Sequence, residues 1–321
     1  MNPASILITG GRGFIGRRLV TRLAAQGTPL RVLTRGRPHV PHECQGDLAE
    51  AAALAVACGG VRRVVHCAGH AHAFGAFGPA EVQRHWRVNF EGTRHLAEAA
   101  GRAGVGRFVF LSSVKAVGEP GEACADEEWP LPPVSDYGRA KRAAEEALLE
   151  TGQRYGMEVV ILRPAMVYGA GGRGNLERMA ALIRRGFFPP LPETGNRRSL
   201  VHVSDLVAAI ELALTAPQAA GRTYTVAHAQ APSGRGLYDA LRAVLGLPPL
   251  GWAVPRPLLV GLARLGDVGE VLMRRRLPFD KDVLERLLGS ACHSPARIAC
   301  ELGWEARVGL AEGLEEMLHG R

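Results

Sequence analysis

The sequence predicts an α/β fold in which a doubly wound parallel sheet is followed by a smaller mixed α/β region. Short apolar strands alternate with amphipathic helices up to about Val167, the order that builds a parallel sheet with helices on both faces. Beyond that point the chain is richer in Pro and Gly and less regular. We therefore expect a sheet domain from 1–168 plus 199–229 and a second domain from 169–198 plus 230–321, with a ligand between them.

The composition is that of a globular protein with an excess of basic residues. The chain has 321 residues, 47% hydrophobic and 22% charged, which suits one large domain or two smaller ones. Lys plus Arg number 39 against 31 for Asp plus Glu, giving a net charge of +8. Because the basic residues are scattered without long runs, we expect no nucleic-acid partner. An anionic lipid or a phosphorylated small molecule remains as the partner that this charge would suit.

Neither the cysteines nor the apolar stretches indicate export or membrane insertion. The six cysteines show no CxxC spacing, and the N-terminus lacks a signal-peptide pattern, so a reducing cytoplasm is the expected location. No stretch of about 18 uncharged apolar residues is present, and we expect no transmembrane segment. The nearest stretch, within 254–277, contains charges such as Arg256 and Asp267, which leaves a surface-lying amphipathic helix open.

The N-terminal segment reads as a strand, a glycine turn, an amphipathic helix and a second strand. Gly10, Gly13 and Gly16 lie between the first strand and the helix, which ends at Gly27. In such a unit the first glycine permits a tight turn, the second lets backbone N–H groups approach a pyrophosphate, and the third packs helix on strand. We therefore expect a dinucleotide site of the Rossmann type. Its expected contacts at this turn are Gly10, Arg12, Gly13, Phe14, Ile15 and Gly16.

The end of the second strand favours NADP(H). An acidic residue there would bind the ribose 2′-hydroxyl, whereas the sequence has Thr34, Arg35, Gly36 and Arg37, which suit a 2′-phosphate. Arg12 could contact the same phosphate. NAD(H) remains possible, because Arg35 and Arg37 could simply reflect an arginine-rich protein.

Further cofactor contacts are expected where the next two strands end. Asp47, followed by Leu48 in the sequence GDL, could lie beside the adenine. The segment VRRVVHCAG reads as a strand leading into a small-residue turn at Cys67, Ala68 and Gly69. We expect these residues to line the cofactor.

Three histidines near this turn, His66, His70 and His72, superficially resemble metal ligands. No acidic or thiolate partner lies at a fitting sequence spacing, so we expect no metal site. Further along, Asn89 stands near the middle of the helical segment WRVNFEGTRHLAEAA. It either bonds a neighbouring backbone group or kinks the helix to hold a water near the site.

Tyr137 and Lys141 are the candidate acid–base pair. They stand four residues apart at the start of a predicted helix, so their side chains share one face. An isolated tyrosine titrates near pH ~10, and a fixed cation beside it stabilises the phenolate and lowers the pKa. An interfacial tyrosine and a solvated lysine are the alternative that two residues alone do not exclude.

The motifs in order carry a resemblance to a known family. TGGRGFIG, Asn89, the strand RFVFLSS ending in Ser113, and YGRAK together resemble the extended short-chain dehydrogenase/reductases, the NAD-dependent epimerase/dehydratase family, over essentially the whole chain. The resemblance implies that Ser113 hydrogen-bonds the substrate oxygen and that Tyr137 exchanges a proton with it. Lys141 would lower the tyrosine pKa and bind the nicotinamide ribose, and Asn89 would complete the catalytic set. Pro164, in ILRPAMVYG, would lie behind the nicotinamide.

The resemblance also implies a UDP-sugar site in the second domain. Asn175 aligns with a residue that contacts the nucleotide-sugar diphosphate, and Arg198 would lie on that diphosphate. Where the family often has an Arg and an Asp near the C-terminus, this chain offers Arg286 and Ser290, which puts the uridine-diphosphate contacts in doubt. Lys115 either contacts the sugar or its acetamido group or is a solvated loop lysine.

The sequence disfavours one reaction of this family and leaves three functions open. The disfavoured reaction is that of a 4,6-dehydratase, because its Asp–Glu pair after the serine is replaced here by residues from Val114 to Val117. A reductase of a UDP-4-keto-6-deoxy-N-acetylhexosamine in bacterial surface-polysaccharide synthesis is favoured by Arg35 and Arg37, since it consumes NADPH. A UDP-hexose 4-epimerase that retains NAD is the first alternative, and a non-catalytic dinucleotide sensor is the second. The family expectation is a homodimer through helices that include 79–100 and 136–155.

Overall fold

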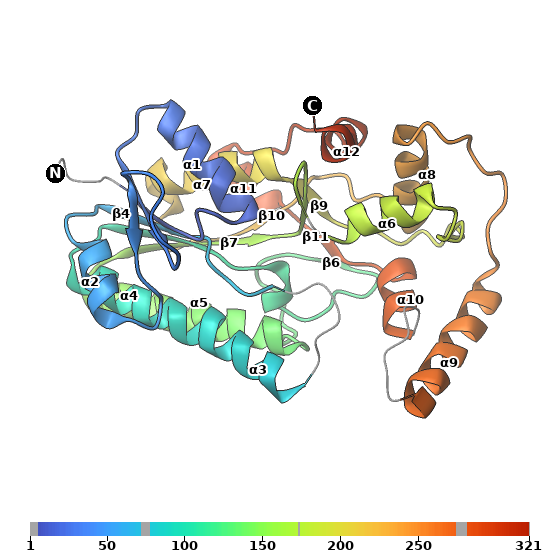
Figure 1. The fold of residues 1–321 in the computed structure, drawn as a ribbon, viewed down its shortest axis with the longest axis horizontal. Coiled ribbons are helices and arrows are strands. Elements are labelled where there is room, and N and C mark those ends of the chain that lie inside the picture. The colour runs from blue at the N-terminus through green and yellow to red at the C-terminus, as the bar shows by residue number, and fades with distance from the viewer. Residues whose placement is uncertain (1–5, 72–77, 173, 274–280, 321) are drawn as a thin grey trace.

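A seven-stranded parallel sheet forms the centre of the computed structural model, which describes residues 6–71, 78–172, 174–273 and 281–320 (Figure 1). In spatial order the strands are β10 (Thr223–Val226), β7 (Glu158–Pro164), β5 (Arg107–Leu111), β4 (Arg63–His66), β1 (Ile6–Thr9), β2 (Leu30–Thr34) and β3 (Glu43–Gln45). Every pairing between these neighbours is parallel. The chain moves outward from β1 in one direction and from β4 in the other, so a switch point lies between these two strands. The predicted doubly wound α/β fold is confirmed.

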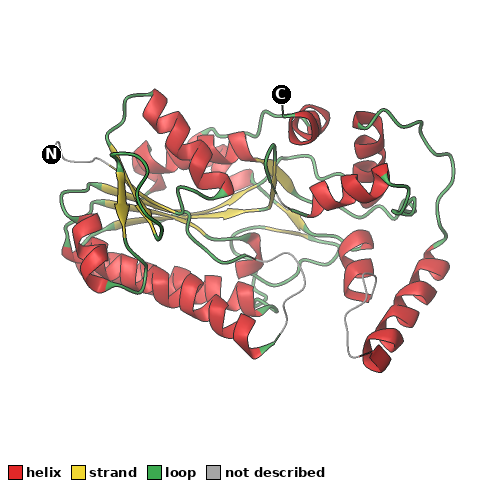
Figure 2. Ribbon diagram, viewed as in Figure 1, coloured by secondary structure: helices red, strands yellow, loops and turns green. Residues whose placement is uncertain are grey.

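Helices cover both faces of the sheet (Figures 1 and 2). Leu7 belongs to the hydrophobic core on one face, and its neighbours Ile6 and Ile8 belong to the core on the other. This alternation follows from the two-residue period of a strand, and burial on both sides explains why the strands are almost wholly apolar. On one face lie α1 (Phe14–Ala25), α7 (Val203–Thr215) and α11 (Ala296–Leu302); on the other lie α2 (Ala51–Cys58), α4 (Gly92–Arg102) and α5 (Asp136–Tyr155). Helix α3 (Pro79–His85) runs into α4 through a π-helical segment, η1 (Trp86–Glu91).

A second group of elements has its own hydrophobic core, which includes Tyr168, Leu237 and Leu314. Its helices are α6 (Asn175–Arg184), α8 (Gly234–Val244), α9 (Arg256–Met273), α10 (Lys281–Leu288) and α12 (Leu310–His319). Two small parallel sheets pair β8 (Met166–Tyr168) with β9 (Leu200–His202), and β6 (Cys124–Ala125) with β11 (Cys292–His293). Two 3₁₀ turns are η2 (Val114–Ala116) and η3 (Pro217–Ala219).

The division into two domains stays a prediction. Ile298 and Trp304, from the C-terminal part of the chain, pack in the core of the main sheet.

A disulfide joins Cys124 on β6 to Cys292 on β11, across 168 residues of sequence. The spacing of these cysteines carried no signal for the pair, because only the tertiary pairing of β6 with β11 brings them together. Cytoplasmic location stays a prediction. Among the described helices, none combines the length and the apolar character that crossing a bilayer requires.

Candidate active site

The glycine turn has the shape that the sequence predicted. Gly10 has a φ of +70°, a left-handed conformation that favours glycine, and a Cβ there would lie 2.6 Å from the backbone nitrogen of Ala68. The turn is closed by a hydrogen bond from the Gly13 N–H to the Gly10 carbonyl, 2.8 Å. Helix α1 begins directly after Gly13, with Phe14 and Ile15 as its first two residues. The backbone N–H groups of its first turn can therefore bind an anion at the carboxyl edge of the sheet.

Arg12, within this turn, is held by a carboxylate. Its Nε and Nη2 atoms donate to the two carboxylate oxygens of Glu43 at 2.8 and 2.7 Å, and Nη2 also donates to the carbonyl of Arg37. The hydrogen bonds from Arg12 lower the pKa of Glu43 to about 2. The structure therefore places Arg12 beside Arg37, as the sequence suggested, but with its charge already paired. Arg35 and Arg37 are exposed.

The other predicted cofactor residues lie around the carboxyl ends of the neighbouring strands. Cys67 and Ala68 follow β4 and donate from their backbone N–H groups to the backbone and side-chain oxygens of Thr9. Asp47 follows β3 and accepts a hydrogen bond from the Ala49 N–H. Leu48 packs beside Gly92 at the start of α4. Pro164 ends β7.

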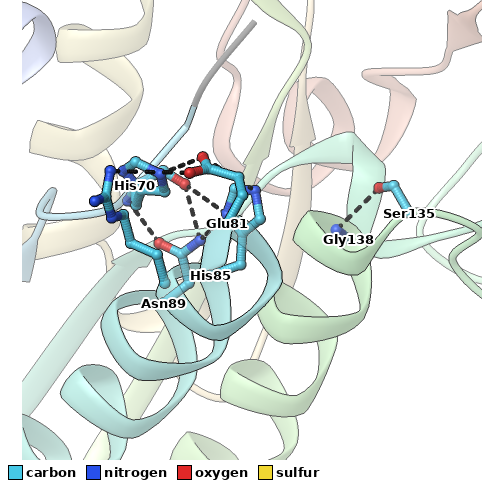
Figure 3. Close-up of polar contacts among 7 residues, drawn as sticks. His70, Glu81, His85, Asn89, Ser135 and Gly138 are labelled. Carbon is cyan, nitrogen blue, oxygen red and sulfur yellow. Dashed lines mark hydrogen bonds and ion pairs between the residues drawn. The ribbon is translucent and has the colours of Figure 1, made fainter. Parts of the chain in front are cut away.

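Tyr137 and Ser113 come together where α5 begins. The Ser135 side chain caps this helix by accepting from the Gly138 N–H, 3.1 Å (Figure 3). Gly138 packs so closely on the 3₁₀ turn after Ser113 that a Cβ would collide with the carbonyl oxygen of Lys115. Because Gly138 has no side chain, the start of α5 can pack against this turn, and the neighbouring Tyr137 reaches Ser113, with which it shares a hydrogen bond.

Burial raises the pKa of Tyr137 above its ordinary value of 10, and the hydrogen bond with Ser113 opposes this only in part. The net change in the tyrosine pKa is therefore opposite to the one that a neighbouring cation alone would cause, and the role of Lys141 in lowering that pKa stays a prediction. The physical reason is that removal from water penalises the phenolate more than its neighbours stabilise it. Tyr137 is consequently protonated at neutral pH.

Lys141 is buried and fixed by two contacts. Its Nζ donates to the carbonyl of Leu111 at 2.6 Å and lies 4.2 Å from the ring centroid of Phe110. Burial lowers the pKa of Lys141 to about 8, although Glu145 opposes that change. The amine therefore keeps its positive charge at neutral pH but loses it under mildly alkaline conditions.

Asn89 lies fully buried in η1 and bonds a backbone on a different element. Its Oδ1 accepts from the His70 N–H at 2.7 Å, and its Nδ2 donates to the His70 carbonyl at 2.9 Å. The first of the two predicted roles, bonding a neighbouring backbone group, is confirmed. The helix around Asn89 also departs from α geometry, as helices frequently do at functional sites.

The two described histidines near this turn, His66 and His70, lie in different environments. His66 is fully buried between the hydroxyls of Thr9 and Thr93, at 2.6 and 2.9 Å, and burial lowers its pKa to about 3. It is a structural residue. His70 instead contacts Glu81, 2.5 Å between Nε2 and Oε1, and tilts against the ring of His85. His72 lies outside the described residues.

The fold therefore brings an acidic residue, Glu81, to His70, although no acidic residue lies at a metal-ligand spacing from it in the sequence. Glu81 and His85 stand at i and i+4 on α3, a spacing that places both on one helix face, and this is the signal that could have found them. The ring of His85 in turn packs edge-on against Tyr137, with centroids 5.6 Å apart.

The predicted substrate residues are only partly brought together. Lys115 is half exposed and forms an ion pair with Glu119. Burial lowers the pKa of His293 to about 4, and the positive charges of Lys115 and Arg198 contribute to this change. Arg198 donates to the Gly289 carbonyl at 3.2 Å. Asn175 is exposed as the first residue of α6. Arg286 belongs to α10, but its side chain lies outside the described residues.

A doubly wound sheet with a glycine turn and a Ser–Tyr–Lys site defines a class of NAD(P)-dependent enzymes. Residues 6–227 match the NAD dependent epimerase/dehydratase family, and the chain belongs to that family. A protein of Vibrio cholerae named UDP-glucose 4-epimerase is 30% identical over 98% of this chain and 94% of its own length. Sterol demethylase protein B of Methylococcus capsulatus is 30% identical over 81% of this chain and 80% of its own. The solved structure of MoeE5 in complex with UDP-glucuronic acid and NAD is 26% identical, covers 98% of each chain and has a TM-score of 0.76.

Proposed function

We propose that the protein is an NADPH-dependent reductase that acts on C4 of a UDP-linked 4-keto-6-deoxy-N-acetylhexosamine. The observation that carries this proposal is the hydrogen bond between the buried Tyr137 and Ser113, and burial favours the protonated form of the phenol. Reduction of a ketone needs a proton donor at the carbonyl oxygen, and a tyrosine whose pKa is raised starts the reaction in the donating form. Oxidation of an alcohol would need the opposite protonation state first.

We assign the residues the roles that the family resemblance implies, and their positions support this assignment. Ser113 would hold the carbonyl oxygen, and Tyr137 would donate its phenolic proton to that oxygen. Lys141, fixed on Leu111 and Phe110, would bind the ribose next to the reacting ring and stabilise the tyrosinate that forms. A reduced nicotinamide, when bound, supplies the hydride.

NADPH is favoured over NADH by the charges at the end of β2. Arg35 and Arg37 are exposed there, and no acidic residue follows the strand directly. A guanidinium can bind a phosphate through two parallel hydrogen bonds, which a ribose hydroxyl cannot match. This placement supports the proposal, with Arg35 as the principal contact of the 2′-phosphate and Gly10 to Gly16 holding the pyrophosphate.

A 4-epimerase that retains NAD is the second candidate. The pairing of Arg12 with Glu43 removes one of the three positive charges that favour a 2′-phosphate. The Vibrio cholerae relative is named as an epimerase, and MoeE5 was solved with NAD. An epimerase oxidises and reduces the same sugar, so it would consume no nicotinamide.

The experiment that separates these functions follows NADPH absorbance with a panel of UDP-sugars. A 4-keto-6-deoxy sugar should oxidise one NADPH per sugar reduced. Steady interconversion of UDP-glucose and UDP-galactose, or of their N-acetyl forms, without added NADPH would contradict the reductase. A steroid ketone belongs in the panel because of the Methylococcus relative. Tight NADPH binding with no turnover of any of these would instead support a dinucleotide sensor.

The UDP-sugar is proposed to lie between the sheet and the second group of helices, near Lys115, Asn175 and Arg198. A homodimer through α4, α5 and their neighbours is proposed with it, and sedimentation would test that state.

A further inference from the structure

His70, Glu81 and His85 form a compact cluster of nitrogen and oxygen ligands beside the proposed active site. Each can offer one ligand atom, and these atoms lie within 4.8 Å of one another. Their side chains are only 14%, 11% and 11% exposed. Figure 3 shows the three side chains and Asn89 turned toward a common centre from the turn after β4, from α3 and from η1.

The separations between the three ligand atoms lie on both sides of the separation that a bound divalent ion would impose, and none exceeds 4.8 Å. Glu81 Oε1 is the central atom, 2.5 Å from His70 Nε2 and 4.0 Å from His85 Nε2. Two ligands of a tetrahedral zinc ion at bond lengths of about 2.0–2.2 Å are separated by about 3.3 Å. Side-chain shifts of about 1 Å, which replace the direct contact between His70 and Glu81 by bonds to the ion, would bring all three atoms to ligand distance.

The surroundings orient His85 as metal-ligating histidines usually are oriented. Its Nδ1 lies 3.2 Å from the backbone carbonyl of His70 and 3.4 Å from Asn89 Nδ2, and its Nε2 faces Glu81 at 4.0 Å. The tautomer with the proton on Nδ1 donates to that carbonyl and leaves the lone pair of Nε2 for a metal ion. A ligating histidine almost always donates its other ring N–H to a carbonyl or carboxylate in this way. Asn89 fixes the same carbonyl by donating to it at 2.9 Å.

The chemistry of the donors points to zinc rather than to magnesium or calcium. Two imidazoles and one carboxylate suit Zn²⁺ and its neighbours in the first transition row, whereas Mg²⁺ and Ca²⁺ take oxygen ligands. Three protein ligands leave one coordination position for water or another oxygen.

We propose that His70, Glu81 and His85 form a Zn²⁺-binding site that clamps the turn after β4 onto α3. Because the His85 ring packs edge-on against Tyr137, the ion would lie one side chain away from the proposed proton donor. The proposal does not depend on the substrate of the enzyme.

The test is equilibrium dialysis of tag-free protein against ZnCl₂, with bound zinc measured by mass spectrometry. We expect about one ion per chain. His85→Phe, which keeps a ring against Tyr137, and Glu81→Gln, which keeps a hydrogen-bond acceptor for His70, should each weaken Zn²⁺ binding by at least about tenfold, as even loss of an outer partner does. His319→Gln and Cys300→Ser are matched controls at exposed positions and should bind Zn²⁺ as the unaltered protein does.

Binding of Co²⁺ to the unaltered protein gives a second measurement that needs no variant. Visible absorption of a four-coordinate ion without a thiolate charge-transfer band is expected for ligation by imidazole and carboxylate. No saturable Zn²⁺ binding below millimolar concentration, equal binding in the ligand variants, or a thiolate band with Co²⁺ would each overturn the proposal.

Discussion

The side-chain amine of Lys141 donates to the backbone carbonyl of Leu111, with 2.6 Å between nitrogen and oxygen. Leu111 is the last residue of β5, two positions before Ser113. This bond ties α5, which carries Tyr137 and Lys141, to the end of the strand that leads to Ser113. The relative position of the three proposed catalytic side chains is therefore fixed by the backbone of the sheet.

Replacing Tyr137 by Phe should leave NADPH binding nearly unchanged and lower turnover by about 10²–10⁴, the usual effect of losing a positioned acid. Tyr155→Phe, at the exposed end of the same helix, is the control and should be nearly as active as the unaltered enzyme. Steady-state rates and a fluorescence titration with NADPH measure the two effects. A Tyr137→Phe enzyme with full turnover would show that another group donates the proton.

NADPH binding should weaken as the pH rises through about 8. The pKa of Lys141 is lowered from 10.5 to about 8 by burial, so the amine is charged below that pH and neutral above it. If the charged amine binds the nicotinamide ribose, affinity falls when the proton is lost. Titrations between pH 6.5 and 9.5 measure this. Lys141→Met should bind NADPH more weakly at neutral pH and lack the decline, and a decline that persists in this variant would contradict the assignment.

Arg35→Ala should weaken NADPH binding about ten- to a hundredfold and hardly change NADH binding. One charge-assisted contact contributes roughly 1.5–3 kcal/mol, which corresponds to that range. Arg102→Ala, an exposed arginine on α4, controls for the general loss of positive charge. Equal losses of NADPH and NADH affinity would show that Arg35 does not bind the 2′-phosphate.

Glu43→Gln should strengthen NADPH binding relative to NADH. The carboxylate pairs with Arg12, and because its pKa is lowered to about 2, it stays charged at any practical assay pH. Only substitution releases the guanidinium for a phosphate. The ratio of the two dissociation constants is the measurement. An unchanged ratio would mean that Arg12 serves only to hold the turn at Arg37.

Glu145→Ala should lower the free energy of unfolding by about 3–5 kcal/mol, the effect of leaving a buried charge without its partner. Glu145 accepts two hydrogen bonds from Arg163, at 2.9 and 2.6 Å, and both residues are buried. Glu146→Ala removes a neighbouring but exposed pair with Arg142 and should change stability by less than about 1 kcal/mol. Denaturant unfolding followed by circular dichroism compares the two, and equal effects would contradict the argument.

Much of the fold was predictable because its signals are local. The glycine turn and the apolar strands depend on neighbours within a few residues, as at Gly10 and Leu7. Tyr137 and Lys141 were found through their helical spacing, and Ser113 through its place after a strand and through the family resemblance.

The features that sequence reasoning missed depend on distant contacts. Glu43 neutralises Arg12 only because β3 lies beside β2, and no spacing rule connects the two residues. Burial raises the pKa of Tyr137, and burial depends on the whole fold, whereas the sequence spacing indicates only the cation one turn away. His70 meets Glu81 for the same reason, through the packing of α3 against the turn after β4.

The disulfide between Cys124 and Cys292 makes the intervening chain a covalent ring. The ring contains Tyr137, Lys141 and Arg198, and so most of the proposed catalytic and substrate residues. A protease that cuts the backbone once within this ring would leave two fragments still attached to each other. On an electrophoresis gel such nicked protein would run as an intact chain until a reducing agent is added, and only then separate.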